Sequence, residues 1–340
     1  MQISEPTARL AEPLAIGASA VPNRVLLAPM SGISDRPFRE IARAYGAGLV
    51  VSEMTASDKL AQGDDEALLR SERAGEGPHV VQLAGRESHW MAEGARAAEA
   101  AGADIIDINM GCPAKKVTGG YSGSALMRDL DHALTLIEAT VAATALPVTL
   151  KMRLGWDERT MNAPELARRA EEAGVRMITV HGRTRCQFYT GTADWAAIRA
   201  VREAIGIPLI ANGALTRPED MPEMLRLSGA DGVMIGRGAC GRPWLPGAMA
   251  TFAATGVMPP APTGAALADL VERHYEGLLA HYGVAIGLRA ARKHLAWYLD
   301  EAGAAPPVAV RTAILTGEDP KAVIRLVRAV LTAQPLRSAA

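Results

Sequence analysis

Eight short apolar runs divide the N-terminal two-thirds of the chain. They begin at Val25, Leu49, His79, Ile105, Pro147, Met177, Pro208 and Gly232. Their apolar residues are nearly continuous rather than alternating with polar ones, which is typical of strands buried on both faces of a parallel sheet. The pattern therefore predicts parallel strands that are covered by helices.

Segments with helical spacing lie between these runs. The clearest cover residues 35–47, 89–101, 163–173 and 217–228. The first has a capping residue at Ser34 or Asp35, and the other three are each followed by a glycine. A polar residue or proline at the start and a glycine at the end is the usual asymmetry of a helix.

The spacing of the runs indicates how strands and helices are assembled. Successive runs start 24, 30, 26, 42, 30, 31 and 24 residues apart. A strand–helix unit repeated eight times near this length is typical of a (β/α)8 TIM barrel. A doubly wound open sheet is the alternative, but it carries a glycine-rich turn after its first strand. Residues 28–32 (APMSG) do not form that turn, so the sequence predicts the barrel.

The longest gap follows the run at Ile105 and places residues 111–124 directly behind the fourth strand. Barrel enzymes carry their chemistry at this end of the strands, so we expect this loop to be functional. Further along, residues 256–264 are rich in proline and glycine, and three helical patterns follow them. We predict a catalytic barrel domain over 1–255, a linker over 256–264 and a helical domain over 265–340.

Composition excludes several classes of protein. Lysine and arginine total 36 against 37 aspartate and glutamate, which disfavours both a disordered chain and a globally basic nucleic-acid binder. Three cysteines without a CxxC pair form neither a disulfide framework nor a zinc site. Residues 1–13 lack the apolar stretch of a secretory signal, and no segment is apolar enough to span a bilayer. We expect a cytoplasmic protein without metal or membrane contact, and a monomer.

Polar residues at the predicted strand ends are the candidates for function. They are Gln82, Asn109, Lys151, Arg153, His181, Arg183 and Asn212. A buried ammonium needs an anionic ligand or a carboxylate, so Lys151 faces either a ligand or Asp107. His181 is either a residue of the functional site or a core histidine whose ring nitrogens are hydrogen-bonded within the protein. Gln82 and Asn212 can bond a planar heterocycle or simply hold a loop.

The last two strands predict a phosphate site. They end in Asn212-Gly213 and Gly236-Arg237-Gly238. Glycines allow backbone N–H groups to approach an anion, and Arg237 adds a forked cation. This is the usual place for phosphate in a barrel.

Cys112 is the candidate reactive group. It lies in the long loop, between a glycine and a proline. A thiol can donate a proton as a general acid or attack as a nucleophile. Cys186 and Cys240 also follow strands, but their surroundings lack the tight NMGCP turn.

Several of these segments together resemble the tRNA-dihydrouridine synthases. The resemblance covers residues 13–330 and rests on motifs that occur in order: 28–38 (APMSGISDRPF), 107–113 (DINMGCP), 180–184 (VHGRT) and 234–238 (MIGRG). Residues 112–117 (CPAKKV) and 292–299 (RKHLAWYL) resemble the bacterial B branch of the family.

The resemblance implies a reaction and a place for each residue. FMN, reduced by NADPH, passes a hydride from its N5 to C6 of a D-loop uridine in tRNA, and Cys112 gives a proton to C5. Pro29, Met30 and Ser31 line the flavin ring, Gln82 bonds its polar edge, and Lys151 lies near N1 and O2. His181, Asn212, Gly213, Ala214, Gly236 and Arg237 hold the ribityl chain and phosphate. Asn109 and Arg183 orient the uracil or its ribose.

One position departs from the family pattern. Ala214 stands where the family usually has an acidic residue. If that carboxylate bonds a ribityl hydroxyl, its loss weakens FMN binding by about one neutral hydrogen bond, ~1 kcal/mol.

The C-terminal segment is only slightly basic, with nine lysines and arginines against seven acidic residues over 265–340. Arg289, Arg292 and Lys293 share one helix face, which is either a solvated surface or, with the resemblance, a contact for the tRNA elbow. Two other readings stay open. One is a flavin barrel that reduces a small molecule, and the other is a regulatory RNA-binding protein with an inactive barrel. The choice between NADPH and NADH and the position of the target uridine also stay open.

Overall fold

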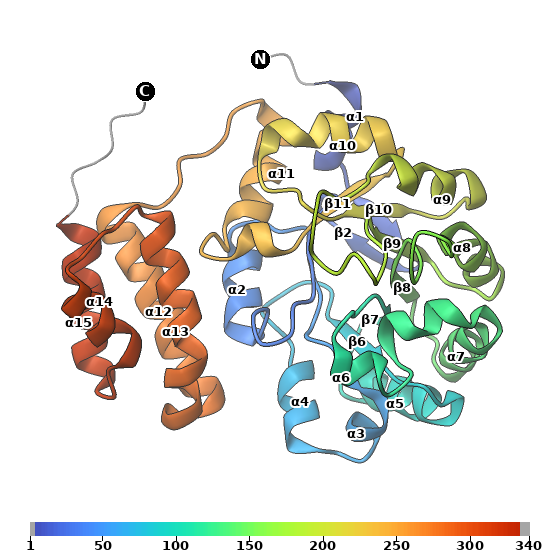
Figure 1. Cartoon of the computed structure of the whole chain (residues 1–340), viewed down its shortest axis with the longest axis horizontal. Coiled ribbons are helices and arrows are strands. Elements are labelled where there is room, and N and C mark those ends of the chain that lie inside the picture. The colour runs from blue at the N-terminus through green and yellow to red at the C-terminus, as the bar shows by residue number, and fades with distance from the viewer. Residues whose placement is uncertain (1–3, 334–340) are drawn as a thin grey trace.

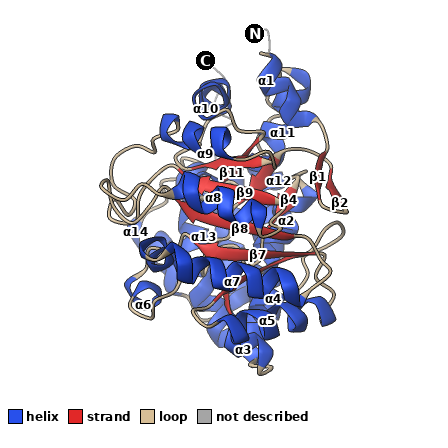
Figure 2. Ribbon diagram, turned by 90° about the vertical axis from the view of Figure 1, so that its right-hand side faces the viewer, coloured by secondary structure: helices blue, strands red, loops and turns tan. Residues whose placement is uncertain are grey.

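The computed structural model describes residues 4–333. Residues 1–3 of the predicted barrel domain and residues 334–340 of the predicted helical domain lie outside the described part. Nine of the described strands form a parallel barrel in which neighbours follow the chain order (Figure 2). The strands are β3 (Val25–Leu27), β4 (Leu49–Val50), β5 (Thr55–Ala56), β6 (Val80–Ala84), β7 (Ile105–Met110), β8 (Val148–Arg153), β9 (Met177–His181), β10 (Leu209–Asn212) and β11 (Gly232–Ile235). The prediction of a (β/α)8 barrel is confirmed.

The second predicted strand differs from the expectation. The run from Leu49 to Met54 is not one strand, because β4 pairs with β3, β5 pairs with β6, and only a bridge from Val51 to Val80 joins the two pieces. The Ser52 hydroxyl accepts the backbone N–H of Gln82 at 2.9 Å, in place of a ladder partner. Ser52 and Glu53 therefore leave the sheet, and the Glu53 side chain becomes available to neighbouring loops.

Helices surround the barrel as the sequence predicts (Figures 1 and 2). They are α2 (Arg36–Ala44), α3 (Ser57–Ala61), α4 (Asp65–Ser71), α5 (Ser88–Ala100), α7 (Leu130–Ala143), α8 (Ala163–Glu172), α9 (Arg199–Ala204), α10 (Met221–Ser228) and α11 (Leu245–Thr255). Asp35 caps α2 by accepting the Phe38 N–H at 3.1 Å. Gly229 ends α10 in the left-handed conformation, at φ +66°. Short 3-10 helices cover Arg9–Ala11, Gly123–Arg128, Ala196–Ile198, Pro218–Asp220 and Arg237–Ala239.

A hairpin that the sequence did not predict closes the N-terminal end of the barrel. It follows the short helix α1 (Glu5–Ala8) and consists of β1 (Leu14–Ile16) and β2 (Ser19–Val21). Leu14 and Ile16 pack into one cluster with apolar residues at the starts of the barrel strands. Strands of three residues are too short for a periodic signal. Because the hairpin blocks this end, the opposite end of the barrel is the open one.

Four helices follow the barrel and pack beside α2 (Figure 1). They are α12 (Gly264–Tyr282), α13 (Val284–Glu301), α14 (Val308–Thr316) and α15 (Pro320–Thr332). The sequence predicted three of them and missed α14. In this helix Val308 is 83% exposed and Ile314 is the buried residue, so it has no clear apolar face. Their core is shared with the barrel side, since Ile41 of α2 and Trp244 pack in the same cluster. Among the described residues, no helix is long and apolar enough to cross a membrane.

Gly247 provides a test of the packing between α11 and the end of α2. A Cβ atom at this position would overlap the backbone carbonyl oxygen of Tyr45, which cannot rotate away. We expect Gly247→Ala to lower the free energy of unfolding in urea by about 1–3 kcal/mol. Gly206→Ala is the control, because its Cβ would meet only the carboxylate end of the Glu171 side chain, at 3.2 Å, and no backbone atom. Equal stabilities of the two variants would contradict this account of the packing.

Candidate active site

A cavity of about 1100 Å³ opens at the carboxyl ends of the barrel strands. Most of the residues singled out from the sequence lie on its wall. They are Pro29, Met30, Ser31, Gln82, Asn109, Cys112, Lys151, His181, Asn212, Gly213, Ala214, Gly236 and Arg237. The volume slightly exceeds the ~300–1000 Å³ of a pocket for one small ligand. The cavity therefore has room for a cofactor and for part of a second molecule.

Cys112 is held in a tight turn after β7. The side-chain oxygen of Asn109 accepts the backbone N–H groups of Gly111 at 3.2 Å and Cys112 at 3.0 Å. The Cys112 carbonyl accepts the hydroxyl of Ser124 at 2.8 Å and its N–H at 3.1 Å. Of the three cysteines, only Cys112 lines the cavity. The turn therefore presents one thiol from a backbone that is fixed on both sides.

A chain of buried polar side chains determines how that turn is oriented. Gln82 donates its N–H to Asp107 at 2.7 Å, and Asn109 donates to the Gln82 oxygen at 2.8 Å. Thr149 donates to the other Asp107 oxygen at 2.5 Å. Burial raises the pKa of Asp107, and these two donors oppose that rise. Because a carboxylate only accepts, it turns the Gln82 nitrogen inward, which in turn aims the Asn109 oxygen at Cys112.

Lys151 brings a positive charge into the cavity from β8. Its ammonium donates to the Asn212 side-chain oxygen at 3.2 Å. Within residues 4–333 it forms no ion pair, so the alternative pairing with Asp107 is not what the structure shows. Burial lowers the Lys151 pKa to about 8, and the nearby Arg153 adds to that effect. A buried cation without a carboxylate fits a site for an anionic group.

His181 lies beside this cation as a neutral imidazole. Burial, followed by the charges of Lys151, Arg153, Arg183 and Arg237, lowers its pKa to about 2. The Nη1 atom of Arg183 lies 3.2 Å from His181 Nε2. Because a guanidinium can only donate, Nε2 is the acceptor and Nδ1 carries the proton.

The end of β10 and the start of the segment after β11 make a cradle for an anion. Gly213 has φ +118°, and a Cβ there would lie 3.0 Å from the His181 ring. Ala214 also has a left-handed backbone, at φ +59°. Arg237 is exposed and forms no ion pair within the described chain. Its guanidinium and the glycine turns fit a phosphate group. Ala214, by contrast, has no carboxylate that could accept a hydrogen bond from a hydroxyl group of the ligand.

Arg183 and the basic residues of α13 do not line the cavity. Arg183 donates to the carbonyls of Thr190 at 3.1 Å and Gly191 at 2.7 Å, and so holds the loop after β9. Arg289 and Arg292 are exposed on α13. Lys293 is half-buried, and its ammonium lies 3.7 Å from where a Cβ on Gly32 would be. The predicted roles of these residues in substrate binding stay predictions.

Arg153 is a candidate of the sequence analysis to which no role was given, and it lies on the cavity wall. It is two residues after Lys151 on β8, so both side chains lie on the same face of the strand. Its guanidinium donates to the carbonyls of Gly111 at 2.8 Å, Thr184 at 2.9 Å and Phe188 at 2.8 Å. It therefore joins the Cys112 turn to the loop after β9. Burial lowers its pKa to about 10, so it remains charged at neutral pH.

The loop after β9 adds two aromatic residues that no periodic pattern in the sequence could reveal. Phe188 and Tyr189 both line the cavity. The Tyr189 ring has the guanidinium of Arg237 4.5 Å from its centroid and that of Arg153 at 5.4 Å. These cation–π contacts position two of the cationic side chains of the wall.

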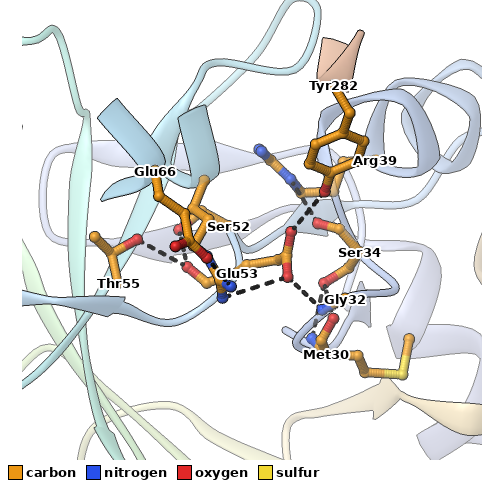
Figure 3. A network of polar contacts seen from close by, with 10 residues as sticks. Met30, Gly32, Ser34, Arg39, Ser52, Glu53, Thr55, Glu66 and Tyr282 are labelled. Carbon is orange, nitrogen blue, oxygen red and sulfur yellow. Dashed lines mark hydrogen bonds and ion pairs between the residues drawn. The ribbon is translucent and has the colours of Figure 1, made fainter. Parts of the chain in front are cut away.

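Glu53 ties the first loop of the cavity to its surroundings (Figure 3). Its side chain is 2% exposed. The carboxylate accepts the backbone N–H of Gly32 and the Tyr282 hydroxyl, the latter at 3.5 Å, and it lies 3.8 Å from Arg70. Because Tyr282 belongs to α12, the loop that carries Pro29, Met30 and Ser31 is held partly by the C-terminal helices. The sequence carried no signal for this contact.

Comparisons with known proteins agree with this geometry. The family model described as Dihydrouridine synthase (Dus) matches residues 26–334. A probable tRNA-dihydrouridine synthase of Rhizobium leguminosarum bv. phaseoli is 59% identical over 304 residues, which is 89% of this chain and 94% of the relative. The tRNA-dihydrouridine synthase B of Xanthomonas campestris pv. campestris is 46% identical over 92% of this chain and 94% of its own.

A likeness to solved structures concerns the fold alone. Morphinone reductase superposes with a TM-score of 0.54 at 18% sequence identity, covering 77% of this chain and 93% of that chain.

Within the described residues, no group of three or more His, Cys, Asp or Glu side chains could hold a metal ion.

Lys151 gives a pH-dependent test of the cavity. With a native pKa of about 8 against 10.5 for the free side chain, the unfolded chain binds more protons between these values. Stability of the ligand-free protein should therefore rise with pH across this window, by an amount that Lys151→Met removes. Thermal unfolding midpoints at about pH 7.5 and about pH 9.5 measure it. Lys321→Met is the control, because Lys321 is exposed on α15 and does not line the cavity. An unchanged pH slope in Lys151→Met would contradict the assignment.

Proposed function

Because the chain belongs to the dihydrouridine synthase family, we propose that it is a flavin-dependent oxidoreductase that reduces a uridine of tRNA to 5,6-dihydrouridine. We propose FMN as the flavin, NADPH as the reductant and a D-loop uridine as the target. One observation carries the proposal. The unpaired Lys151 ammonium and the Cys112 thiol line the same cavity, which also holds an anion cradle.

The residues of the cavity fit FMN at both of its ends. The cradle around Gly213, Gly236 and Arg237 suits the phosphate, and Lys151 would stabilise negative charge on the reduced ring. Pro29, Met30 and Ser31 would line the ring on a loop that Glu53 fixes. When bound, FMN would supply hydride transfer between a nicotinamide and the C5=C6 bond of the base.

The orientation of Asn109 determines what the base must present to it. Its oxygen is occupied by two backbone N–H groups, and one of its N–H bonds is directed at Gln82. The remaining hydrogen-bonding group is an N–H donor, which requires an acceptor such as a uracil carbonyl. A base with an amino group at that position would place two donors face to face. Asn109 would thereby favour uracil over cytosine.

Cys112 would supply the proton that completes the reduction. Hydride addition at C6 places negative charge on the base, and the thiol would protonate C5. Ser124 and Asn109 hold the backbone of Cys112, so the thiol is directed by a turn that does not have to form during the reaction. The thiolate would then regain its proton from solvent.

Substitution of Cys112 tests the reaction itself. We expect Cys112→Ala to keep the flavin absorbance and NADPH-driven flavin reduction while tRNA reduction falls by about 100- to 10,000-fold, the usual contribution of a general acid. Dihydrouridine would be measured by mass spectrometry of tRNA. Cys186→Ala and Cys240→Ala are the controls. If the wild type holds flavin yet leaves all tRNA unchanged, the proposed reduction of tRNA is wrong.

The exposed arginines of α13 are the proposed contacts for the tRNA backbone. Replacing Arg289 and Arg292 by glutamine should weaken tRNA binding. The slope of log Kd against the logarithm of the salt concentration should also fall by about one for each lost phosphate contact. Arg325→Gln on α15 is a matched control, because Arg325 is also exposed. A salt dependence equal to that of the wild type would remove α13 from the tRNA interface.

A further inference from the structure

Two loops at the mouth of the cavity hold most of the exposed aromatic side chains of the described chain. The protein has 14 Phe, Trp and Tyr residues in all. Within residues 4–333 the exposed ones are Tyr45, Tyr121, Phe188 and Tyr189. Tyr121 belongs to the loop after β7, and the last two belong to the loop after β9. Exposed rings are costly to hydrate, so their concentration beside one opening indicates a surface that another molecule covers.

Tyr121 belongs to the segment that packs on the Cys112 turn. Its neighbours Gly120 and Ser122 line the cavity. Gly123 follows Ser122, and a Cβ on Gly123 would lie 2.9 Å from the Cys112 carbonyl oxygen. This segment therefore packs directly on the Cys112 backbone. The Tyr121 side chain nevertheless remains 67% exposed. It therefore stands at the rim, next to the position where a base would react.

Both rim residues have a backbone conformation that side chains with a Cβ rarely adopt. Tyr121 has φ +58° and Phe188 has φ +54°. Such strain persists where the surrounding structure imposes it, and it is concentrated at functional sites. At Phe188 that restraint is visible, since the Arg153 guanidinium holds its carbonyl at 2.8 Å. At Tyr121 the backbone N–H donates to the Thr118 carbonyl at 3.1 Å, so a hydrogen bond restrains the backbone at both positions.

The charge of the two loops identifies the kind of molecule that covers them. Residues 111–128 contain Lys115, Lys116 and Arg128 and no acidic residue, and residues 182–191 contain Arg183 and Arg185 and no acidic residue. The Arg185 guanidinium also donates to the Thr118 hydroxyl in the loop after β7, at 3.5 Å. Aromatic rings among cations without carboxylates suit unpaired nucleic acid, whose bases stack while its phosphates pair with the cations.

We propose that Tyr121 and Phe188 stack on the unpaired nucleobases that flank the reacting uridine and so hold the RNA loop open. This inference rests on the proposed function and adds to it a binding role for residues outside the reacting centre. A uridine must leave its stack to enter the cavity, which exposes the faces of its neighbours. The rim rings would replace those lost stacking contacts.

The test uses the flavin-loaded protein and a tRNA that it reduces. Tyr121→Leu and Phe188→Leu keep apolar bulk but remove the ring, whereas Tyr121→Phe and Phe188→Tyr keep the ring. We expect each leucine variant to raise KM for tRNA about fivefold or more, as expected for the loss of one base–aromatic stack. At saturating tRNA, kcat should change much less. The variants that keep the ring should behave like the wild type, as should Tyr45→Leu.

A second measurement separates stacking from a general effect on the loop. Transcripts that carry an abasic site on either side of the target uridine should bind the wild type as weakly as the normal tRNA binds a leucine variant. The same transcripts should lose little further affinity with that variant, because the missing base was the partner of the missing ring.

The outcomes separate this inference from the proposed function. The stacking role would be overturned if the leucine variants kept the wild-type KM. It would also be overturned if the affinity lost through an abasic site added fully to the affinity lost through a leucine variant. In both cases tRNA reduction by the wild type would remain. Absence of tRNA reduction by the wild type would instead overturn the proposed function, and the inference with it.

Discussion

Lys151 carries a positive charge into the interior of the barrel, and much of the cavity is arranged around that charge. Its nearest partner is a neutral amide, that of Asn212, and burial lowers its pKa to about 8. Arg153 and Arg237 add further cations to the same wall, and the neutral His181 tolerates them. This arrangement favours the entry of an anion, because the buried Lys151 gives up water without gaining a counter-charge. The cavity is therefore built for a ligand that brings negative charge, as a phosphate-bearing flavin does.

A second constraint acts on the residue that would react. The two oxygens of Asp107 accept hydrogen bonds from Gln82 and Thr149, and this arrangement sets the direction of the amides that connect Asp107 to Cys112. Arg153 holds the same turn from the other side through the Gly111 carbonyl. The proposed proton donor thus gains its placement from the buried Asp107 and Arg153 and from Asn109, the residue proposed to contact the base. Fixing such a geometry before the substrate binds is what makes a general acid effective.

The C-terminal helices are connected to this arrangement by direct contacts. Tyr282 reaches Glu53, which also holds Gly32 in the first cavity loop, and Lys293 lies close to the same glycine. A tRNA that lay on α13 would therefore be placed next to the proposed flavin loop rather than at a distance from it. On the opposite rim, Tyr121 and Phe188 would complete the enclosure of the base.

The sequence by itself determined the barrel, its open end and most of the cavity wall. Buried parallel strands leave continuous apolar runs at a regular spacing, and polar residues at the ends of such runs converge on one opening. The roles of Arg153, Glu53, Tyr121 and Phe188 were decided only by the tertiary structure. Arg153 acts through three backbone carbonyls from two loops, and a carbonyl has no signature in a sequence. Glu53 depends on an interrupted strand and on Tyr282, which is 229 residues away along the chain. Contacts of this kind depend on where loops meet in space, and loop geometry has no periodicity from which it could be predicted.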